Sequence, residues 1–252
     1  MRNVKDKVAW ITGAGSGIGA GAAACLAREG MRIVLSGRRR QALEEVAKGL
    51  EVETFVAPLD VADRKAVNAT FEQLLGKFGR VDVLVSSAGL NARNRHWHHL
   101  AADDWDRVIR VDLDGAFYCA KAVLPTMIAQ KDGLIVNVSS WAGKYPSMLT
   151  GPAYSAAKHA LNAMTESLNM EAGIHGVRAT ALCPGEVATP ILDNRPVPTS
   201  AEEKARMVQS DDCGEIIAFL ARMPTHVCIN ELTLSPTWNR SYAAQALQLQ
   251  KL

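Results

Sequence analysis

Short apolar runs alternate with longer segments in which apolar residues recur at helical spacing, almost to the end of the chain. We expect seven β-strands, at Val8–Thr12, Arg32–Ser36, Glu53–Pro58, Val81–Ser86, Gly133–Ser139, Val177–Cys183 and Ile229–Leu234. We expect six helices between them, at Gly17–Glu29, Arg39–Lys48, Asp63–Phe78, Ala102–Ala129, Pro152–His175 and Asp211–Met223. Regular alternation of strand and helix predicts a parallel sheet with helices on both faces, and therefore one α/β domain over residues 1–252.

Two segments fall outside this alternation. Residues 185–210 contain several prolines and no clear periodicity. A long irregular loop in a compact domain is usually functional or disordered, and we assign this one to substrate binding. The polar tail after Pro236 has two interpretations, a short helix on a partner subunit or a frayed end.

The composition, 48% hydrophobic and 21% charged over 252 residues, is that of a globular domain with a sizeable core. A net charge of +2 gives no electrostatic case for nucleic acid or a membrane surface as partner. No apolar run approaches the ~18 residues needed to span a bilayer, and Met1–Lys7 does not resemble a signal peptide. The five cysteines are scattered and odd in number, which predicts free, mostly buried thiols; we expect a cytoplasmic protein.

A glycine-rich turn follows the first strand directly. Gly13 allows the tight turn, Gly17 lets the backbone approach a pyrophosphate, and Gly19 lets the next helix pack close to the sheet. That helix offers free N–H groups and the positive end of its dipole to phosphate. A plain tight turn is the alternative, which the position after the first strand disfavours. We assign to cofactor binding Gly13, Ser16, Gly17, Ile18 and Gly19.

Arg38, Arg39 and Arg40 follow the second strand, and no carboxylate stands beside them. Sites for NAD place an acidic residue here on the ribose 2′-OH, whereas an arginine accommodates the 2′-phosphate of NADP. A solvated basic helix start is the alternative, although basic residues there oppose the helix dipole. We therefore expect NADP(H), with Arg38 and Arg39 as its ligands.

Tyr154 and Lys158 lie one helical turn apart, fourteen residues after Ser140. That spacing places the phenol and the ammonium on one face of a helix. A nearby cation favours phenolate, so we expect the pKa of Tyr154 to fall from about 10 towards neutrality. An acid/base pair combined with a nucleotide-binding turn indicates a redox enzyme.

Other candidates also follow strands, where ligands bind in open α/β sheets. Asp60 and Val61 follow the third strand, Ser86–Gly89 the fourth, and Pro184 and Gly185 the sixth. The Asp60 carboxylate is suited to the adenine amino group, although Asp is also a common N-cap. Small residues at Ser86–Gly89 would let a cofactor lie close.

Three further clusters carry open alternatives. His96, His98 and His99 match no tetrahedral metal spacing, so we expect no metal. Trp141 and Tyr145 line a pocket or pack in the core. The candidates for pairing with a substrate carboxylate, each with surface solvation as its alternative, are Arg93, Arg95, Lys144 and Arg195.

Together these motifs resemble the short-chain dehydrogenase/reductase family over about residues 6–235. The resemblance implies a Rossmann-type seven-stranded sheet with strand order 3-2-1-4-5-6-7. It implies that Tyr154 is the catalytic acid/base, that Ser140 holds the substrate oxygen, and that Lys158 binds the nicotinamide ribose. It also implies a homodimer or homotetramer formed through Ala102–Ala129 and Pro152–His175. The cofactor residues assigned outside the glycine turn are Arg38, Arg39, Asp60, Val61, Ser87, Ala88, Gly89, Tyr154, Lys158, Pro184, Gly185, Val187 and Thr189.

The chain departs from the family pattern at three places. Ser86 and Ser87 replace the usual Asn-Asn, and Asp112 replaces an Asn that holds a water linked to the active-site lysine. We assign Asp112 to the catalytic group; an exposed helix residue without a role is the alternative. The ending, Ile229–Thr237, resembles NADP-dependent 3-hydroxy acid dehydrogenases and also some steroid or terpenol reductases.

These observations predict an NADP(H)-dependent carbonyl reductase or alcohol dehydrogenase. A catalytically silent NADP-binding regulator is the first alternative, and a sugar epimerase or dehydratase is the second. For the substrate we expect a small polar carbonyl compound such as a hydroxy or keto acid. The rival is a bulky apolar alcohol, which would be accommodated by Trp97, Trp141, Met148 and Leu149.

Overall fold

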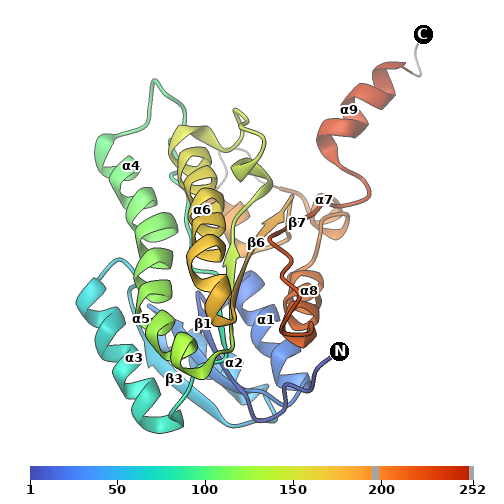
Figure 1. Ribbon diagram of the computed structural model, residues 1–252. Coiled ribbons are helices and arrows are strands. Elements are labelled where there is room, and N and C mark those ends of the chain that lie inside the picture. The colour runs from blue at the N-terminus through green and yellow to red at the C-terminus, as the bar shows by residue number, and fades with distance from the viewer. Residues whose placement is uncertain (195–198, 250–252) are drawn as a thin grey trace.

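The computed structural model describes residues 1–194 and 199–249, and its elements follow the predicted alternation (Figure 1). Within these residues one parallel sheet has the order β3-β2-β1-β4-β5-β6-β7, which confirms the expected topology. Its strands are β1 (Val8–Thr12), β2 (Arg32–Gly37), β3 (Thr54–Pro58), β4 (Val83–Ser86), β5 (Gly133–Val138), β6 (Val177–Pro184) and β7 (Glu231–Leu234).

Helices cover both faces of this sheet. On one face pack α1 (Gly17–Arg28), α2 (Arg40–Lys48) and α8 (Ser210–Arg222). On the other pack α3 (Arg64–Phe78), α5 (Gly115–Gln130) and α6 (Gly151–Ala172). Successive strand residues serve alternate cores because side chains along a strand point to opposite faces: Ile11 of β1 packs under α1, and Trp10 under α3.

The predicted helix Ala102–Ala129 is three elements in the structure. α4 (Ala102–Ile109) passes into a π-helical turn, Arg110–Asp114, before α5 begins. A π turn holds one more residue than an α turn and occurs often at functional sites. The backbone stays helical throughout, so the predicted helical stretch is confirmed. The apolar spacing of the sequence does not distinguish the π turn from the helix around it, so this turn was missed.

The predicted substrate loop contains local structure. Pro190–Asn194 form a 3₁₀ turn, and α7 (Ala201–Ala205) begins at a capping box made by Ser200 and Glu203. Residues 195–198 lie outside the described part, and the candidate Arg195 is among them. The polar tail forms α9 (Arg240–Leu249), which extends away from the body of the molecule (Figure 1). In the residues described, no helix is both long and apolar enough to cross a membrane.

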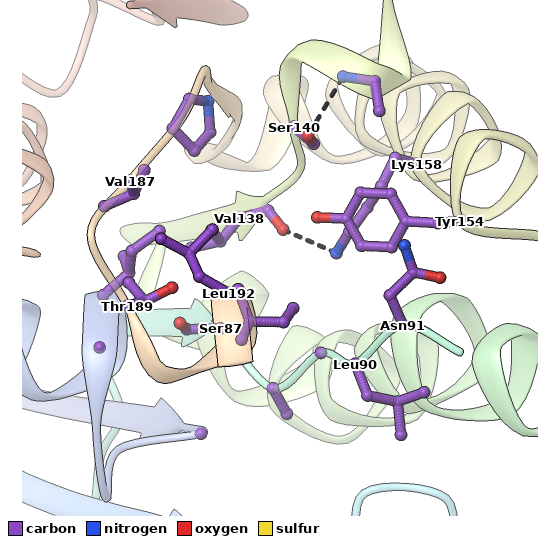
Figure 2. Close-up of a pocket in the computed structure, with 18 of the residues that line it drawn as sticks. Ser87, Leu90, Asn91, Val138, Ser140, Tyr154, Lys158, Val187, Thr189 and Leu192 are labelled. Atoms are coloured by element: carbon purple, nitrogen blue, oxygen red, sulfur yellow. Dashed lines mark hydrogen bonds between the residues drawn. The ribbon is translucent and has the colours of Figure 1, made fainter. Parts of the chain in front are cut away.

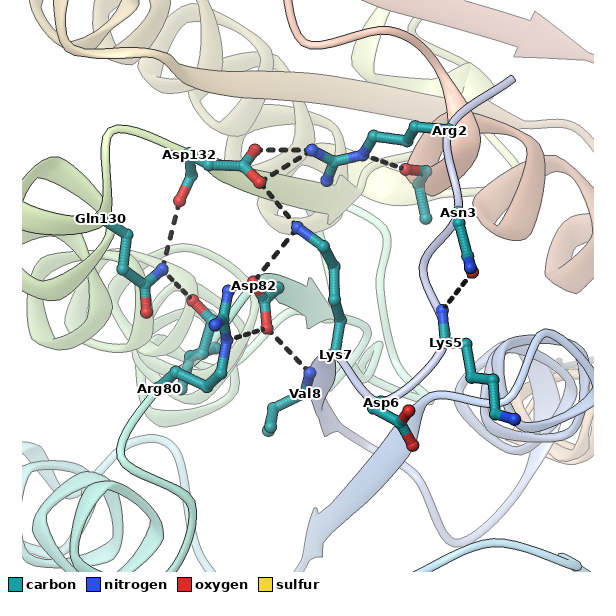
Figure 3. A network of polar contacts seen from close by, with 12 residues as sticks. Arg2, Asn3, Lys5, Asp6, Lys7, Val8, Arg80, Asp82, Gln130 and Asp132 are labelled. Atoms are coloured by element: carbon teal, nitrogen blue, oxygen red, sulfur yellow. Dashed lines mark hydrogen bonds and ion pairs between the residues drawn. The ribbon is translucent and has the colours of Figure 1, made fainter.

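A network of charged side chains joins the N-terminus to the amino ends of the central strands (Figure 3). The buried Asp82 carboxylate accepts hydrogen bonds from the Val8 N–H and the Arg80 guanidinium. Asp132 accepts hydrogen bonds from Arg2 at 2.7 Å and from Lys7 at 2.8 Å. These contacts hold the first residues of the chain against the amino ends of the strands. The sequence motifs lie at the opposite, carboxyl ends.

Candidate active site

A cavity of about 870 Å³ lies at the carboxyl ends of the strands. It is bordered by every residue predicted to bind the cofactor except Gly19. A Cβ added at Gly19 would lie 2.4 Å from the Gly13 carbonyl oxygen. Gly19 therefore allows α1 to pack closely on the glycine turn, and it does not border the cavity.

The glycine turn forms one end of the cavity. Gly13 has a φ of +65°, and a Cβ there would lie 2.7 Å from the Ala88 backbone nitrogen, so only glycine fits. The N-cap of α1, Ser16, makes no side-chain capping hydrogen bond, and the first turn of α1 contains no acidic residue. The first N–H groups of α1 are therefore not occupied by a side-chain cap, which suits an anionic ligand.

Arg38, Arg39 and Asp60 border the same end of the cavity as exposed side chains. The N-cap interpretation of Asp60 was wrong, because Asp63 caps α3 by accepting hydrogen bonds from two N–H groups of its first turn. Asp60 is thus not committed to capping the helix. The arrangement brings two cations and one carboxylate together beyond β2 and β3.

Tyr154 and Lys158 project from α6 into the cavity, facing Thr189 and Leu192 across it (Figure 2). The Lys158 ammonium lies 5.4 Å from the centre of the Tyr154 ring and donates a 3.1 Å hydrogen bond to the Val138 carbonyl. Ser140 follows β5 and borders the cavity beside them, where its hydroxyl accepts a hydrogen bond from the Ala142 N–H. The structure therefore gathers three of the four predicted catalytic residues at one place.

Asp112 lies behind these residues, on the π-helical turn. Its side chain is 1% exposed and does not border the cavity. One carboxylate oxygen accepts a 2.8 Å hydrogen bond from the Leu90 N–H, and the other lies 3.3 Å from the Lys158 ammonium. The alternative of an exposed helix residue was wrong. A direct ion pair therefore joins Asp112 to Lys158, and Asp112 reaches the cavity only through that lysine.

The pKa of Tyr154 is raised, not lowered as the sequence predicted, because the phenol is buried. Burial is the largest effect and raises the pKa of the Tyr154 phenol, and the Asp112 charge raises it further. The Lys158 charge and the hydrogen bond with Ser140 lower it, but the pKa remains above its usual value. Burial lowers the pKa of Lys158, but the Asp112 carboxylate and the Tyr154 phenolate charge together offset this and raise it, so the ammonium form is favoured. Burial raises the pKa of Asp112, and Lys158 opposes that rise. The sequence reasoning counted the lysine and omitted the burial of the phenol.

Only some of the residues predicted to bind substrate border the cavity. Arg95 is 6% exposed and borders the cavity, whereas Arg93 is exposed and does not border it, and Lys144 pairs with Glu231. Among the rival apolar residues, Trp141 and Leu149 line the cavity with Tyr145; Trp97 and Met148 are exposed and do not. The described residues contain no group of three His, Cys, Asp or Glu side chains suited to a metal ion.

The sequence analysis missed the contribution of the C-terminal segment. Tyr242 borders the cavity and its ring centre lies 6.0 Å from that of Trp141. Arg240 pairs with Glu186 at 3.4 Å and with Glu203 at 3.2 Å. The start of the tail therefore lies on the cavity of its own chain, and no local sequence signal marks these long-range contacts.

The site combines a glycine turn, a helix N-terminus without a side-chain cap and a Ser-Tyr-Lys group, all at the carboxyl ends of a parallel sheet. These are the features of a dinucleotide-dependent oxidoreductase. The comparisons with known proteins agree with this class.

The sequence profile described as short chain dehydrogenase matches residues 7–198. The chain belongs to this family. An uncharacterized oxidoreductase of Staphylococcus saprophyticus is 36% identical over 242 residues, covering 94% of this chain and all of the relative.

Solved structures of oxidoreductases are similar to the whole fold. An alcohol dehydrogenase from the archaeon Thermococcus sibiricus, complexed with 5-hydroxy-NADP, has a TM-score of 0.84 and 30% identity, covering 94% of this chain and 99% of its own. The closed form of a serine dehydrogenase complexed with NADP+ has a TM-score of 0.86 and 28% identity, covering 92% and 96%. The protein is therefore an oxidoreductase of the short-chain dehydrogenase family.

Proposed function

We propose that the protein is an NADP(H)-dependent oxidoreductase that interconverts a carbonyl compound and a secondary alcohol. The observation that carries the proposal is the convergence of Tyr154, Lys158 and Ser140 on the cavity that the glycine turn also borders. Arg38 and Arg39 at its far end favour a 2′-phosphate, and solved structures similar to this chain are complexed with NADP or its analogue.

The residues present fit such a cofactor. The glycine turn leaves backbone at the cavity wall where a Cβ would not fit, and the N-terminus of α1 suits a pyrophosphate. Arg38 and Arg39 would hold the 2′-phosphate, and Lys158 the ribose beside the nicotinamide. When bound, the nicotinamide supplies or accepts the hydride.

Tyr154 would supply the proton in carbonyl reduction, and solvent would restore it. Its raised pKa keeps the phenol protonated at neutral pH, which is the form a proton donor requires. The Ser140 hydroxyl would donate a hydrogen bond to the same carbonyl oxygen and stabilise the charge that develops there. Oxidation of the alcohol needs the phenolate, so it should require a more alkaline pH than reduction.

Turnover of NADPH with a panel of aldehydes and ketones tests the proposal. Consumption of NADPH that depends on a carbonyl substrate is expected, with the corresponding alcohol as product. Tight NADPH binding without turnover of any member of the panel would favour the silent regulator instead. Product analysis by mass spectrometry separates reduction from epimerisation or dehydration, which leave NADPH unconsumed.

We also propose a homodimer or homotetramer, as the family resemblance implies, which light scattering at micromolar concentration tests. A monomeric mass would contradict it. The described cysteines, four buried and Cys228 exposed, are all free thiols. Free thiols support the proposal that the enzyme works in a reducing compartment such as the cytoplasm.

A further inference from the structure

The catalytic end of the cavity has an aromatic wall. Trp141 directly follows Ser140 in the chain and borders the cavity that Ser140 and Tyr154 also border. The Tyr242 ring lies beside that of Trp141 in an edge-to-face arrangement, with ring centres 6.0 Å apart and an angle of 65° between the ring planes. Leu192 faces Tyr154 across the cavity (Figure 2). Aromatic and apolar side chains therefore line the cavity near the group that would transfer the proton.

The start of the C-terminal segment is held beside the cavity by Arg240. This side chain forms ion pairs with Glu186, at 3.4 Å, and with Glu203, at 3.2 Å. Both glutamates belong to the segment 185–210, so one cation joins that segment to the start of α9. The Tyr242 N–H donates a 3.0 Å hydrogen bond to the Asn239 carbonyl at the first turn of α9. Tyr242 is therefore a built part of the cavity wall, although the rest of α9 extends away from the body of the molecule (Figure 1).

The Tyr242 ring is only partly covered by the protein. Tyr242 is 57% exposed, although it borders the cavity and lies beside Trp141. Trp238, earlier in the same segment, does not border this cavity, and its ring centre lies 5.3 Å from the guanidinium carbon of Arg206. Among the residues that the structure describes, none after Tyr242 borders the cavity. Exposed apolar surface on the wall of a cavity is typical of a ligand-binding groove.

We infer that Trp141 and Tyr242 bind an aromatic ring of the substrate, so that the enzyme acts on ketones and secondary alcohols with an aromatic body. The inference rests on the proposed function for the reaction and extends it to the substrate class. A substrate ring placed on this wall is removed from water together with the exposed tyrosine ring. Aromatic rings also attract one another in offset or edge-to-face geometry beyond the effect of the buried area. The carbonyl of such a substrate would point towards Ser140 and Tyr154.

A purely structural role for Tyr242 makes a different prediction. If its ring only packed against the cavity wall, its loss would weaken turnover of small and ring-bearing substrates alike. If it binds a substrate ring, its loss would weaken the ring-bearing substrates and spare the small ones. Trp238 offers a matched control, since it is an exposed aromatic residue of the same segment and does not border the cavity.

The first experiment measures kcat/KM with NADPH for methyl ketones that share one reacting carbonyl. The native enzyme should prefer 4-phenylbutan-2-one to butan-2-one by at least about tenfold, because the phenyl ring is buried on binding. Tyr242→Ala should reduce that preference by at least about threefold while turnover of butan-2-one stays, and Tyr242→Phe and Trp238→Ala should keep the preference. A native enzyme without the preference, a preference unchanged in Tyr242→Ala, or faster turnover of 3-oxobutanoate than of 4-phenylbutan-2-one would overturn the inference.

The second experiment measures binding without turnover, with amides that have the shape of these ketones. Calorimetric titration into the NADPH complex should show 3-phenylpropanamide binding at least about tenfold more tightly than propanamide and at least about twofold more tightly than 3-cyclohexylpropanamide. Trp238→Ala should keep both differences, and Tyr242→Ala should reduce them. Binding of 3-phenylpropanamide that is no tighter than that of the other amides, or that is unchanged in Tyr242→Ala, would refute recognition of an aromatic ring. Because this comparison needs no reaction, it separates failure of the inference from failure of the proposed function, which turnover reports.

Discussion

Two clusters of buried charge lie at opposite ends of the same sheet. The network at the amino ends of the strands joins Arg2, Lys7, Arg80, Asp82 and Asp132 (Figure 3). The cluster at the carboxyl ends contains the Asp112–Lys158 ion pair beside Tyr154 (Figure 2). The first lies away from the cavity and the second borders it, and the two also differ in how many partners each carboxylate has.

Asp132 and Asp112 make the contrast concrete. Burial would raise the pKa of Asp132, but the hydrogen bonds and the charges of Lys7 and Arg2 together offset this and lower that pKa. Asp112 meets one N–H group and one ammonium, and burial raises its pKa. Each donor favours the charged form of a carboxylate, so Asp132 is a more stable anion than Asp112. The Asp112 charge in turn raises the pKa of Tyr154.

The largest effect should come from removing the reacting group. Tyr154→Phe should lower kcat by about 10²- to 10⁴-fold, because it removes the proton carrier and little else. NADPH affinity and the free energy of unfolding should stay close to native, measured by fluorescence titration and by urea denaturation. Tyr145→Phe, at another tyrosine of the cavity wall, is the control and should keep kcat. Retention of more than a few per cent of kcat in Tyr154→Phe would contradict the assignment.

The next effect concerns cofactor choice at the far end of the cavity. The native enzyme should bind NADP(H) at least about tenfold more tightly than NAD(H), since a charge-assisted contact contributes about 1.5–3 kcal/mol. Arg38→Asp should erase or reverse this preference. Arg40→Asp is the matched control, because Arg40 is exposed, pairs with Glu44 and does not border the cavity. Equal native affinity for the two cofactors by titration would show the assignment to be wrong.

Asp112 tests whether the sparse cluster acts on the reaction. Asp112→Ala should lower kcat at least about tenfold, the scale of one lost positioning interaction of ~1.4 kcal/mol. The Asp112 charge raises the pKa of Tyr154, so its removal in Asp112→Asn should lower that pKa. Oxidation rises with pH as the phenol ionises, and its midpoint should therefore move to lower pH in Asp112→Asn, which should stay active. If Asp112→Ala kept the native rate and pH profile, Asp112 would have no effect on the reaction and the prediction would be wrong.

The smallest effect should come from the opposite end of the sheet. Asp132→Asn should lower the free energy of unfolding by about 1 kcal/mol and leave kcat unchanged, because it weakens hydrogen bonds far from the cavity. The folded-state pKa of Asp132 is lowered, so its contribution is complete above the unfolded pKa of about 3.9 and is lost as pH falls through the folded value. The difference in stability between native and variant should therefore shrink below about pH 4. The control is Asp6→Asn, at an exposed residue of the N-terminal segment. A change in kcat in Asp132→Asn would remove the distinction between the two clusters.

Much of the fold and site could be predicted from local signals. Short spacings predicted the strand and helix alternation, and the rule that ligands bind at carboxyl strand ends predicted where Ser140, Tyr154 and Lys158 lie. The strand order was expected from the family resemblance. The π-helical turn at Arg110–Asp114 was missed because its apolar pattern matches that of the helices beside it. The contribution of Tyr242 was missed because it depends on contacts across the fold.

The sequence by itself determined the class of protein, since motif spacing and strand alternation are local properties of the chain. Tertiary structure alone decided which of several similar residues matter. It buried Arg95 and left Arg93 exposed, and it paired Asp112 with Lys158 beneath the cavity. It also raised the pKa of Tyr154, where the spacing to Lys158 alone predicted a fall. The physical reason is that burial and the summed field of all neighbours set the behaviour of a charge, and neither can be computed from sequence distance.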